Sequence, residues 1–477
     1  MKKVITAFVI LFVISCVSFA QVETFDLSKF KLPYLKYQSL DLNFNTNNQS
    51  QSDSWKDTSD YKYNYNNIYT YLNVGGSYYL YKNTAMEQST YSFGTNISLY
   101  PIIGNTSLYD DESIERNSSS NLYMQLNGST RNRIYFNSPF FFEIGPNVGI
   151  FYYRDFNKYT YKDEEGNVTF EHKSIANQPE IRTTLEFGLG YGRIEQVTDA
   201  QMALFILKDL KKENRLTREP THEEIYKLAE LISQKRNQRF FDSRHRTINE
   251  VKAIDTFLTS QGLSEQTDAS YFTTIYDNWL YSNNPNRASG FRVSGGPKVA
   301  YTIYNYNNSW ELLEPMQDDN EITSKGSFLE YGAWLNVLDE KPINHFWQRT
   351  LSAIFTYTLI KNTSALNDDP TYKRLQDNFE VNLNASIGYY PTTRTYLKFG
   401  LGTGMRVNNM DKYYYLADTD YDDDQSAYLR IYAGPNANGY YYFSPKLRLN
   451  FSGSLTYNFY NTDNFSLISP PAGFGFN

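Results

Sequence analysis

The sequence predicts an all-β fold, a transmembrane antiparallel β-barrel of about fourteen strands with an α-helical insert. Three observations support this prediction. Apolar and polar residues alternate over long stretches, and the connections between these stretches are short and long in turn. The mean hydropathy of -0.58 is too polar for helical membrane spans, and the one long apolar run lies at the N-terminus.

The alternation is clearest between residues 379 and 406. Successive side chains of a strand point to opposite faces, so each arm of this segment has an apolar and a polar face. The apolar set of the first arm is Phe379, Val381, Leu383, Ala385, Ile387 and Tyr389, and the second arm continues with Leu397, Phe399, Leu401 and Met405. A turn at 391–394 separates the arms. Each arm exceeds the roughly 9–11 residues that a tilted strand needs to cross a membrane.

The pattern of the first twenty residues predicts a secretory signal peptide. Lys2 and Lys3 precede an apolar run from Val4 to Phe19, and a small-x-small site ends at Ala20. The single cysteine, Cys16, lies in this run, and a lipoprotein signal with lipidation at Cys16 is the alternative. Cleavage after Ala20 leaves a mature chain without disulfides or thiolate metal sites.

Residues 21–33 are expected to form an irregular periplasmic lead-in, and residues 34–194 and 287–477 the barrel. The expected strands are 34–45, 61–81, 88–100, 121–136, 140–153, 178–191, 290–304, 327–337, 346–360, 378–390, 395–406, 426–443, 446–459 and 465–476. Short connections fall at 82–87, 137–139, 339–345, 391–394 and 444–445. Long polar ones fall at 46–60, 101–120, 154–177, 305–326, 361–377 and 407–425.

This arrangement resembles that of bacterial outer-membrane β-barrel proteins of the porin-like kind, which have short periplasmic turns and long external loops. The resemblance covers the mature chain apart from one insert. The last residues, Gly473 to Asn477, are similar to the aromatic-ended closing strand of that class, although Asn477 follows Phe476. The resemblance implies the outer membrane of a Gram-negative bacterium and its lipid as surroundings.

The insert, residues 195–286, changes to helical periodicity. Thr198 with Gln201, Thr221 with Glu224 and Thr247 with Glu250 have the spacing of capping boxes. A fourth helix is expected near 267–280. The count of connections assigns the insert to the short-turn, periplasmic side. It could hang below the barrel or plug it, and the bulk of such a bundle favours the former.

Several charged residues share the polar parity of their strands and should face the lumen. They are Arg182, Glu186, Arg292, Lys298, Glu380, Lys398, Arg406, Lys446 and Arg448. Charged rings of this kind set the selectivity of a pore. The equal alternative is an ion-paired core that stiffens a closed barrel.

Arginine and phenylalanine gather in the insert and suggest a docking surface for a periplasmic protein, because both are favoured at interface centres. The residues are Arg236, Arg239, Phe240, Phe241, Arg244 and Arg246. A helix junction with Phe240 and Phe241 in the bundle core is the favoured alternative.

The candidate metal site is weak. Asp418, Asp420 and Asp422 resemble the start of a calcium loop, but Asp423 replaces the required glycine and Leu429 the bidentate glutamate. A solvated acidic loop is the better interpretation.

No cofactor site or catalytic residue is expected. The glycine series 188/190/192 and 400/402/404 lie within strands, where glycine makes room or permits bending, and no phosphate-binding helix follows them. His172, near Glu171 and Asp155, is read as an ordinary loop residue.

The net charge of -7 argues against a nucleic-acid partner. We expect a channel or transport-type porin whose insert gates it or docks a partner. The alternative is a non-conducting anchor for assembly or adhesion, and a barrel-rim hydrolase ranks third.

Overall fold

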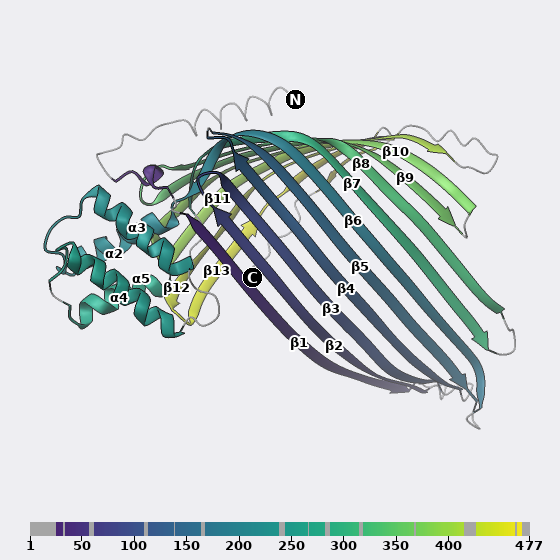
Figure 1. Ribbon diagram of the computed structural model, residues 1–477. Coiled ribbons are helices and arrows are strands. Elements are labelled where there is room, and N and C mark those ends of the chain that lie inside the picture. The colour runs from purple at the N-terminus through teal and green to yellow at the C-terminus, as the bar shows by residue number, and fades with distance from the viewer. Residues whose placement is uncertain are drawn as a thin grey trace.

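Long antiparallel strands make up most of the computed structural model (Figure 1). It describes residues 25–31, 34–56, 62–108, 113–137, 139–163, 167–237, 244–265, 267–281, 287–313, 318–366, 369–414, 426–462 and 465–469. The strands are β1 (Leu35–Lys56), β2 (Lys62–Asn83), β3 (Glu87–Leu108), β4 (Ser113–Tyr135), β5 (Phe140–Lys162), β6 (Val168–Gln196), β7 (Ala288–Leu313), β8 (Asp318–Pro342), β9 (Trp347–Leu366), β10 (Asp369–Thr392), β11 (Thr395–Tyr414), β12 (Ser426–Ser444), β13 (Leu447–Ser454), β14 (Tyr457–Thr462) and β15 (Phe465–Ser469).

Each strand pairs with its neighbours in sequence, in a simple up-and-down order. β13 and β14 both pair with β12, along its later and earlier halves respectively, and Leu455 and Thr456 separate them. They therefore act as one interrupted strand, and the sheet has the fourteen positions that the sequence predicts. Among the described residues, the pairing runs from β1 to β15, and no pair joins these two edges.

The strands are longer than the alternation suggested, and much of what was expected to be long loop is strand. β5 and β6 pair as far as Lys162 and Val168, where an external loop was expected from 154 to 177. The prediction of strand ends was wrong because the apolar face stops there while the hydrogen-bonded ladder continues. Backbone groups pair whatever the side chains are, so a polar strand extends a sheet into water.

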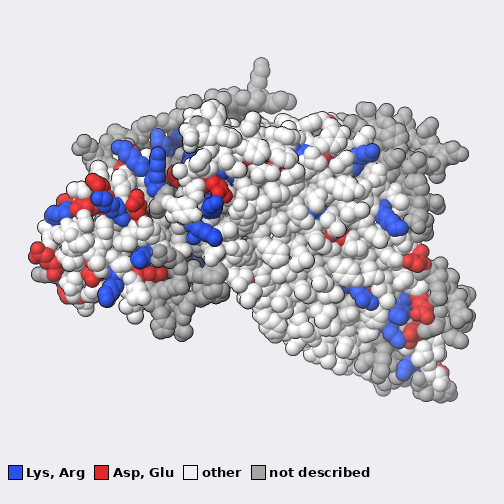
Figure 2. Space-filling view, viewed as in Figure 1, with Lys and Arg blue, Asp and Glu red and all other residues white. Residues whose placement is uncertain are grey.

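The two faces of the sheet differ as the alternation predicts. Leu42, Phe44 and Leu189 point outward and are 78%, 66% and 71% exposed. In the space-filling view, charged side chains gather over the helices and at the far end of the strands, and the wall between is largely free of charge (Figure 2). An exposed apolar band between two charged zones is the outer surface expected of a membrane-spanning barrel.

Glycines in β6 make room for rings on the concave face. A Cβ at Gly190 would lie 2.2 Å from the Phe141 ring, and one at Gly188 would lie 2.8 Å from the Trp334 ring. Gly192 and Gly290, at φ of 90° and 128°, bend the β6–β7 pair where it leads into the insert. The room-making and bending roles expected of the strand glycines are present here.

Four helices form the insert: α2 (Thr198–Lys212), α3 (His222–Asn237), α4 (Arg244–Ser260) and α5 (Ala269–Leu280). Their apolar faces meet in one core that includes Ile206, Leu228, Ile254 and Ile275, all fully buried. The bundle lies beyond the end of the strands that carries the short turns, outside the concavity of the sheet (Figure 1). No helix in the described ranges is long and apolar enough to cross a membrane.

Of the three expected capping boxes, one forms. The Glu224 carboxylate accepts from the Thr221 backbone N–H at 2.8 Å, and Thr221 Oγ1 accepts from the Glu224 N–H. The prediction of a cap at Thr198 is wrong. The Thr198 hydroxyl accepts a hydrogen bond from the Arg287 backbone N–H and caps no helical N–H. α4 begins at Arg244, so Thr247 lies inside the helix.

The expected irregular lead-in is instead a folded part of the bundle. Residues 25–31 contain a 3-10 helix, η1 (Leu27–Lys29), and Phe25, Leu27 and Phe30 are buried in the core of the insert. Tyr226 of α3 donates to the Asp26 carbonyl at 2.8 Å. Three large apolar side chains within six residues favour burial, and this pattern is a signal in the sequence for a folded segment.

Candidate functional site

Charged residues on the concave face form a network across β4, β5 and β6. Arg133 binds both oxygens of the Glu143 carboxylate at 3.2 and 3.3 Å, and Arg131 donates to Glu186 at 2.6 Å. Glu143 is 1% exposed. Of these four residues, only Glu186 was predicted to line the lumen. The others share the polar parity of their strands, so the same rule could have found them.

Four of the other eight predicted lumen charges also have carboxylate or arginine partners. Glu380 accepts from Arg406 at 2.6 Å, Lys298 lies 3.9 Å from Glu330, and Arg182 pairs with Glu180. Arg448 stacks on the rings of Tyr440 and Tyr442. Arg292 lies near Arg133 and Glu143, and Lys398 and Lys446 make no ion pair within the described part of the chain.

The junction between insert and sheet is built around Arg287, directly before β7. Its side chain is fully buried and donates to the carbonyls of Asn344, His345 and Trp347 at 2.9, 2.6 and 2.9 Å. A further bond reaches the Gln348 amide oxygen, and the guanidinium lies over the Tyr390 ring. Burial lowers the pKa of Arg287 to about 10, so the group remains charged at neutral pH.

α5 contacts the turn between β10 and β11. Arg394 of this turn pairs with Asp277, and Thr393 donates to the Asn278 side chain at 3.2 Å. The ring of Tyr281, at the end of α5, packs on Tyr442 of β12. These contacts attach the bundle to the later strands of the sheet.

The same bundle also reaches the first strand. Leu35 of β1 belongs to the core of the insert, and Tyr81 of β2 packs against that core. The bundle therefore spans the short-turn end from β1 to β12 and covers that end of the sheet. Which compartment this end faces stays a prediction, and the predicted choice of periplasm rests on the short turns.

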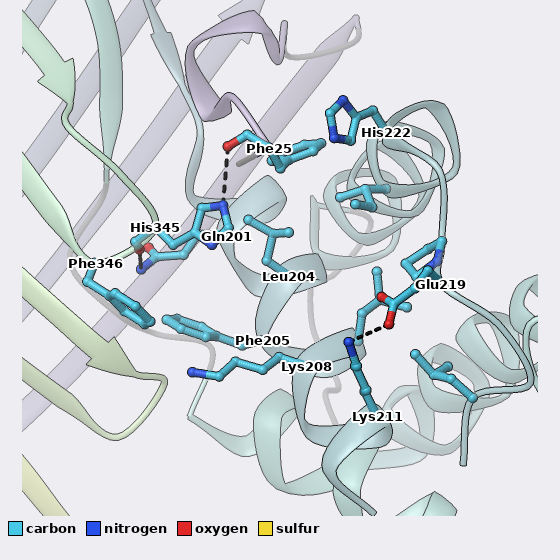
Figure 3. Close-up of a pocket in the computed structure, with 14 residues that line it drawn as sticks. Phe25, Gln201, Leu204, Phe205, Lys208, Lys211, Glu219, His222, His345 and Phe346 are labelled. Carbon is cyan, nitrogen blue, oxygen red and sulfur yellow. Dashed lines mark hydrogen bonds and ion pairs between the residues drawn. The ribbon is translucent and has the colours of Figure 1, made fainter. Parts of the chain in front are cut away.

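A cavity of about 290 Å³ lies between the bundle and the β8–β9 turn (Figure 3). Phe25, Leu204, Phe205 and Phe346 give it an apolar lining, and Lys208 extends along it with its ammonium over the Phe346 ring. His345 of the turn contacts the Phe25 carbonyl at 3.2 Å. Burial, with Arg287 and Lys208 nearby, lowers the pKa of His345.

The predicted docking residues are described only in part. Arg236 pairs with Asp199 at 2.6 Å inside the bundle. Arg239, Phe240 and Phe241 lie outside the described residues, and Arg244 and Arg246 are placed in α4 by their backbone alone. Docking of a partner there stays a prediction.

The acidic triplet Asp418, Asp420 and Asp422 also lies outside the described residues. In the ranges that are described, no group of three or more His, Cys, Asp and Glu side chains is placed to hold a metal ion. His172 of β6 lies beside the Tyr159 ring of β5, within the extended sheet where a loop was expected.

Comparison with known proteins gives little. No family model matches the chain, and no curated protein matches it. Among solved structures, the translocator domain of autotransporter NalP from Neisseria meningitidis matches with 10% identity and a TM-score of 0.21. The match covers 90% of this chain and 84% of that chain. A likeness this low supports no argument about fold or function.

The fold class therefore rests on the chain itself. Fourteen antiparallel strand positions in sequence order, an apolar outer face and a polar, ion-paired concave face are present together. The predicted combination of about fourteen antiparallel strands with an α-helical insert is confirmed, and a sheet with these two faces is typical of membrane β-barrels.

Proposed function

We propose that this protein is a transport-type channel of a Gram-negative outer membrane, with its periplasmic end covered by the helical bundle. The observation that carries the proposal is the position of the bundle. It contacts β1 through Leu35, the β8–β9 turn through Gln201 and the β10–β11 turn through Asp277 and Asn278. A folded domain across one end of a polar-walled sheet can act as a gate.

The contacts differ in strength, and this difference supports movement of the bundle. Around Arg287 they are buried and charge-assisted. On the α5 side the paired Arg394 and Asp277 are 37% and 42% exposed, and the buried bond from Thr393 to Asn278 is a single neutral one. Exposed ion pairs typically contribute up to about 1 kcal/mol. The α5 side is therefore the side expected to release first, with the β6–β7 connections as the hinge.

Conductance in planar bilayers tests the proposal. Cys16 is the only cysteine and precedes the expected cleavage site, so a new pair can be introduced without interference. We replace Asn278 and Thr393 by cysteine and join them by oxidation or a short bis-thiol linker. The joined form should conduct less than the reduced form, and each single-cysteine variant should conduct equally before and after the same treatment.

A second candidate, a non-conducting anchor that presents the bundle, is favoured by one observation. Charges such as Glu143 and Glu380 are paired with arginine, as a rigid interior requires. Silence of the reduced form and of an Arg394→Ala variant in bilayers would overturn the channel and leave the anchor. Conductance in either form would overturn the pure anchor.

A further inference from the structure

A polar groove lies on the concave face of β1 to β4, away from the bundle. It has a volume of about 370 Å³. Its lining includes Asp41, Asn43, Ser77, Asn96, Gln125 and Asn127. These are amide and hydroxyl side chains with one carboxylate, and no lysine or arginine lines the groove among the described residues.

The amides of this groove are held in place by one another. Asn43 donates to Asn73 at 3.3 Å, and Asn73 donates to Asn96 at 2.7 Å and to Ser98 at 2.8 Å. Asn73 is 5% exposed and forms the centre of this ladder across three strands. A fixed amide presents both a donor and an acceptor to a ligand without first losing rotamer freedom.

Glycines keep the floor of the groove open. A Cβ at Gly75 would lie 2.3 Å from Asn43 Oδ1, so only glycine allows this amide its position. At Gly94 the nearest atom to a Cβ would be the Gly76 carbonyl oxygen at 4.0 Å, which leaves free space above the backbone. Asp41, Ser77 and Asn127 have no hydrogen-bond partner within the described residues, so their polar atoms are available.

Tyrosine pairs lie along the strands on either side of the groove. Tyr71 and Tyr100 stack at 4.6 Å, each two residues along its strand from a member of the ladder, and thus about 7 Å away on the same face. Tyr79, two residues beyond Ser77, lies 6.1 Å from the Tyr37 ring. Tyr100 and Tyr79 are 42% and 39% exposed, so their rings are accessible.

We propose that this groove binds a neutral polyhydroxylated solute, a sugar or short oligosaccharide, as cargo of the channel. Hydroxyl groups both donate and accept, which matches amides, and the C–H faces of a sugar ring fit the electron-rich faces of tyrosine. The lack of a lysine or arginine in the lining disfavours an anion, for which a cationic contact is the usual recognition. Transport of the sugar rests on the channel proposal, whereas binding of the sugar in this groove does not.

The test measures binding of neutral glucose hexasaccharides, α-linked and β-linked, to the full-length protein in detergent by calorimetry. A polyethylene glycol of matched size and an acidic galacturonate oligomer serve as comparison solutes. At least one neutral sugar should bind, and neither comparison solute should. The absence of binding by both neutral sugars, or equal binding of the polyethylene glycol, overturns the inference.

Variants locate the site. Tyr100→Ala removes one aromatic face and should weaken binding by about fivefold to tenfold, whereas Tyr100→Phe retains the ring and most of the affinity. Asn96→Leu should weaken binding further because it also releases Asn73. Tyr304→Ala is the matched control, since Tyr304 stacks on Phe328 on the same concave face but across β7 and β8. Equal loss in the control overturns the assignment to this groove.

Conductance separates the two proposals. A binding sugar should lower the current through the unmodified channel, and it should lower the current through Tyr100→Ala less. Current without any sugar binding overturns the sugar site and leaves the channel. Sugar binding by a protein that never conducts overturns the channel and leaves the site.

Discussion

At the scale of single residues, Arg287 is the side chain on which the junction most depends. It satisfies three backbone carbonyls of the β8–β9 turn from a fully buried position. A charged donor is the efficient solution there, because one guanidinium supplies five N–H groups in a fixed plane. Without it, carbonyl groups of the turn lose their partners in a place that water does not easily reach.

Arg287→Met should destabilise the protein by about 3 kcal/mol or more, since it leaves buried carbonyls unpaired. Chemical unfolding measures the change, followed by the fluorescence of Trp279 in a background in which the other four tryptophans are replaced by phenylalanine. Arg182→Met is the matched control, because the side chain of Arg182 is 59% exposed and contacts the Glu180 carboxylate and the Phe151 ring without satisfying any buried carbonyl. A loss no greater than that of the control would contradict the role given to Arg287.

Glu224 closes the one capping box that forms. Hydrogen bonds from Arg218 and from the Thr221 backbone lower the pKa of Glu224 from 4.5 to about 2. A carboxyl group whose pKa is lower in the folded than in the unfolded state stabilises the fold at a pH above its unfolded pKa. This stabilisation is lost as the pH falls from about 4.5 towards 2.

Glu224→Gln should therefore lower the free energy of unfolding of the bundle by about 1 kcal/mol at pH 7 and by less near pH 3. Thermal unfolding at the two pH values checks this. Glu223→Gln is the control, since Glu223 makes only an exposed i,i+4 pair with Lys227. An equal loss at both pH values would show that the carboxylate charge is not the cause.

At the scale of elements, the β8–β9 turn and the N-terminal segment meet beside His345. The Phe25 carbonyl accepts from the ring, and Arg287 and Lys208 lie near enough to disfavour a positive charge on it. Burial is the main cause that lowers the pKa of His345 below 6.5, and the bond to the Phe25 carbonyl opposes this only in part, so the folded state favours the neutral ring. The stabilisation is complete above pH 6.5 and is lost as pH falls below it.

Docking of residues 25–31 should weaken as the pH falls from 7 to 5. The readout is a lower protection factor for hydrogen exchange in α2 and α3, which corrects for the intrinsic slowing of exchange at low pH. His345→Gln should remove most of this pH dependence, because glutamine can donate but does not titrate. His222→Gln is the control, since the ring of His222 touches Phe25 but has no hydrogen bond to its carbonyl. An unchanged profile in His345→Gln would contradict this assignment.

At the scale of the whole molecule, the outer face decides whether the protein enters a membrane. Leu42 and Asp41 are neighbours in β1 and point to opposite faces. Leu42→Lys should destabilise the membrane-inserted form by about 2 kcal/mol, because an ammonium then meets lipid. Asp41→Lys adds the same side chain on the concave face and should cost far less. Folding titrations in lipid vesicles compare them, and equal losses would refute the assignment of the faces.

The sequence alone determined the strand order, the number of strand positions and the faces, because these depend on local periodicity and on the length of connections. It also determined three of the helical stripes and the cap at Thr221. The period of two identifies the polar face, so Glu380 and Arg406 were both predicted to face the lumen. The same rule could have predicted this for Arg131, Arg133 and Glu143.

Only the tertiary structure decided where the strands end, because the ladder of backbone hydrogen bonds continues past the last apolar side chain. It also decided that Phe25 and Phe30 fold into the insert and that Arg287 joins insert to sheet. The hydrogen bond between His345 and the Phe25 carbonyl spans 320 positions. Contacts between residues so far apart in the chain follow from packing in three dimensions, which local periodicity does not encode.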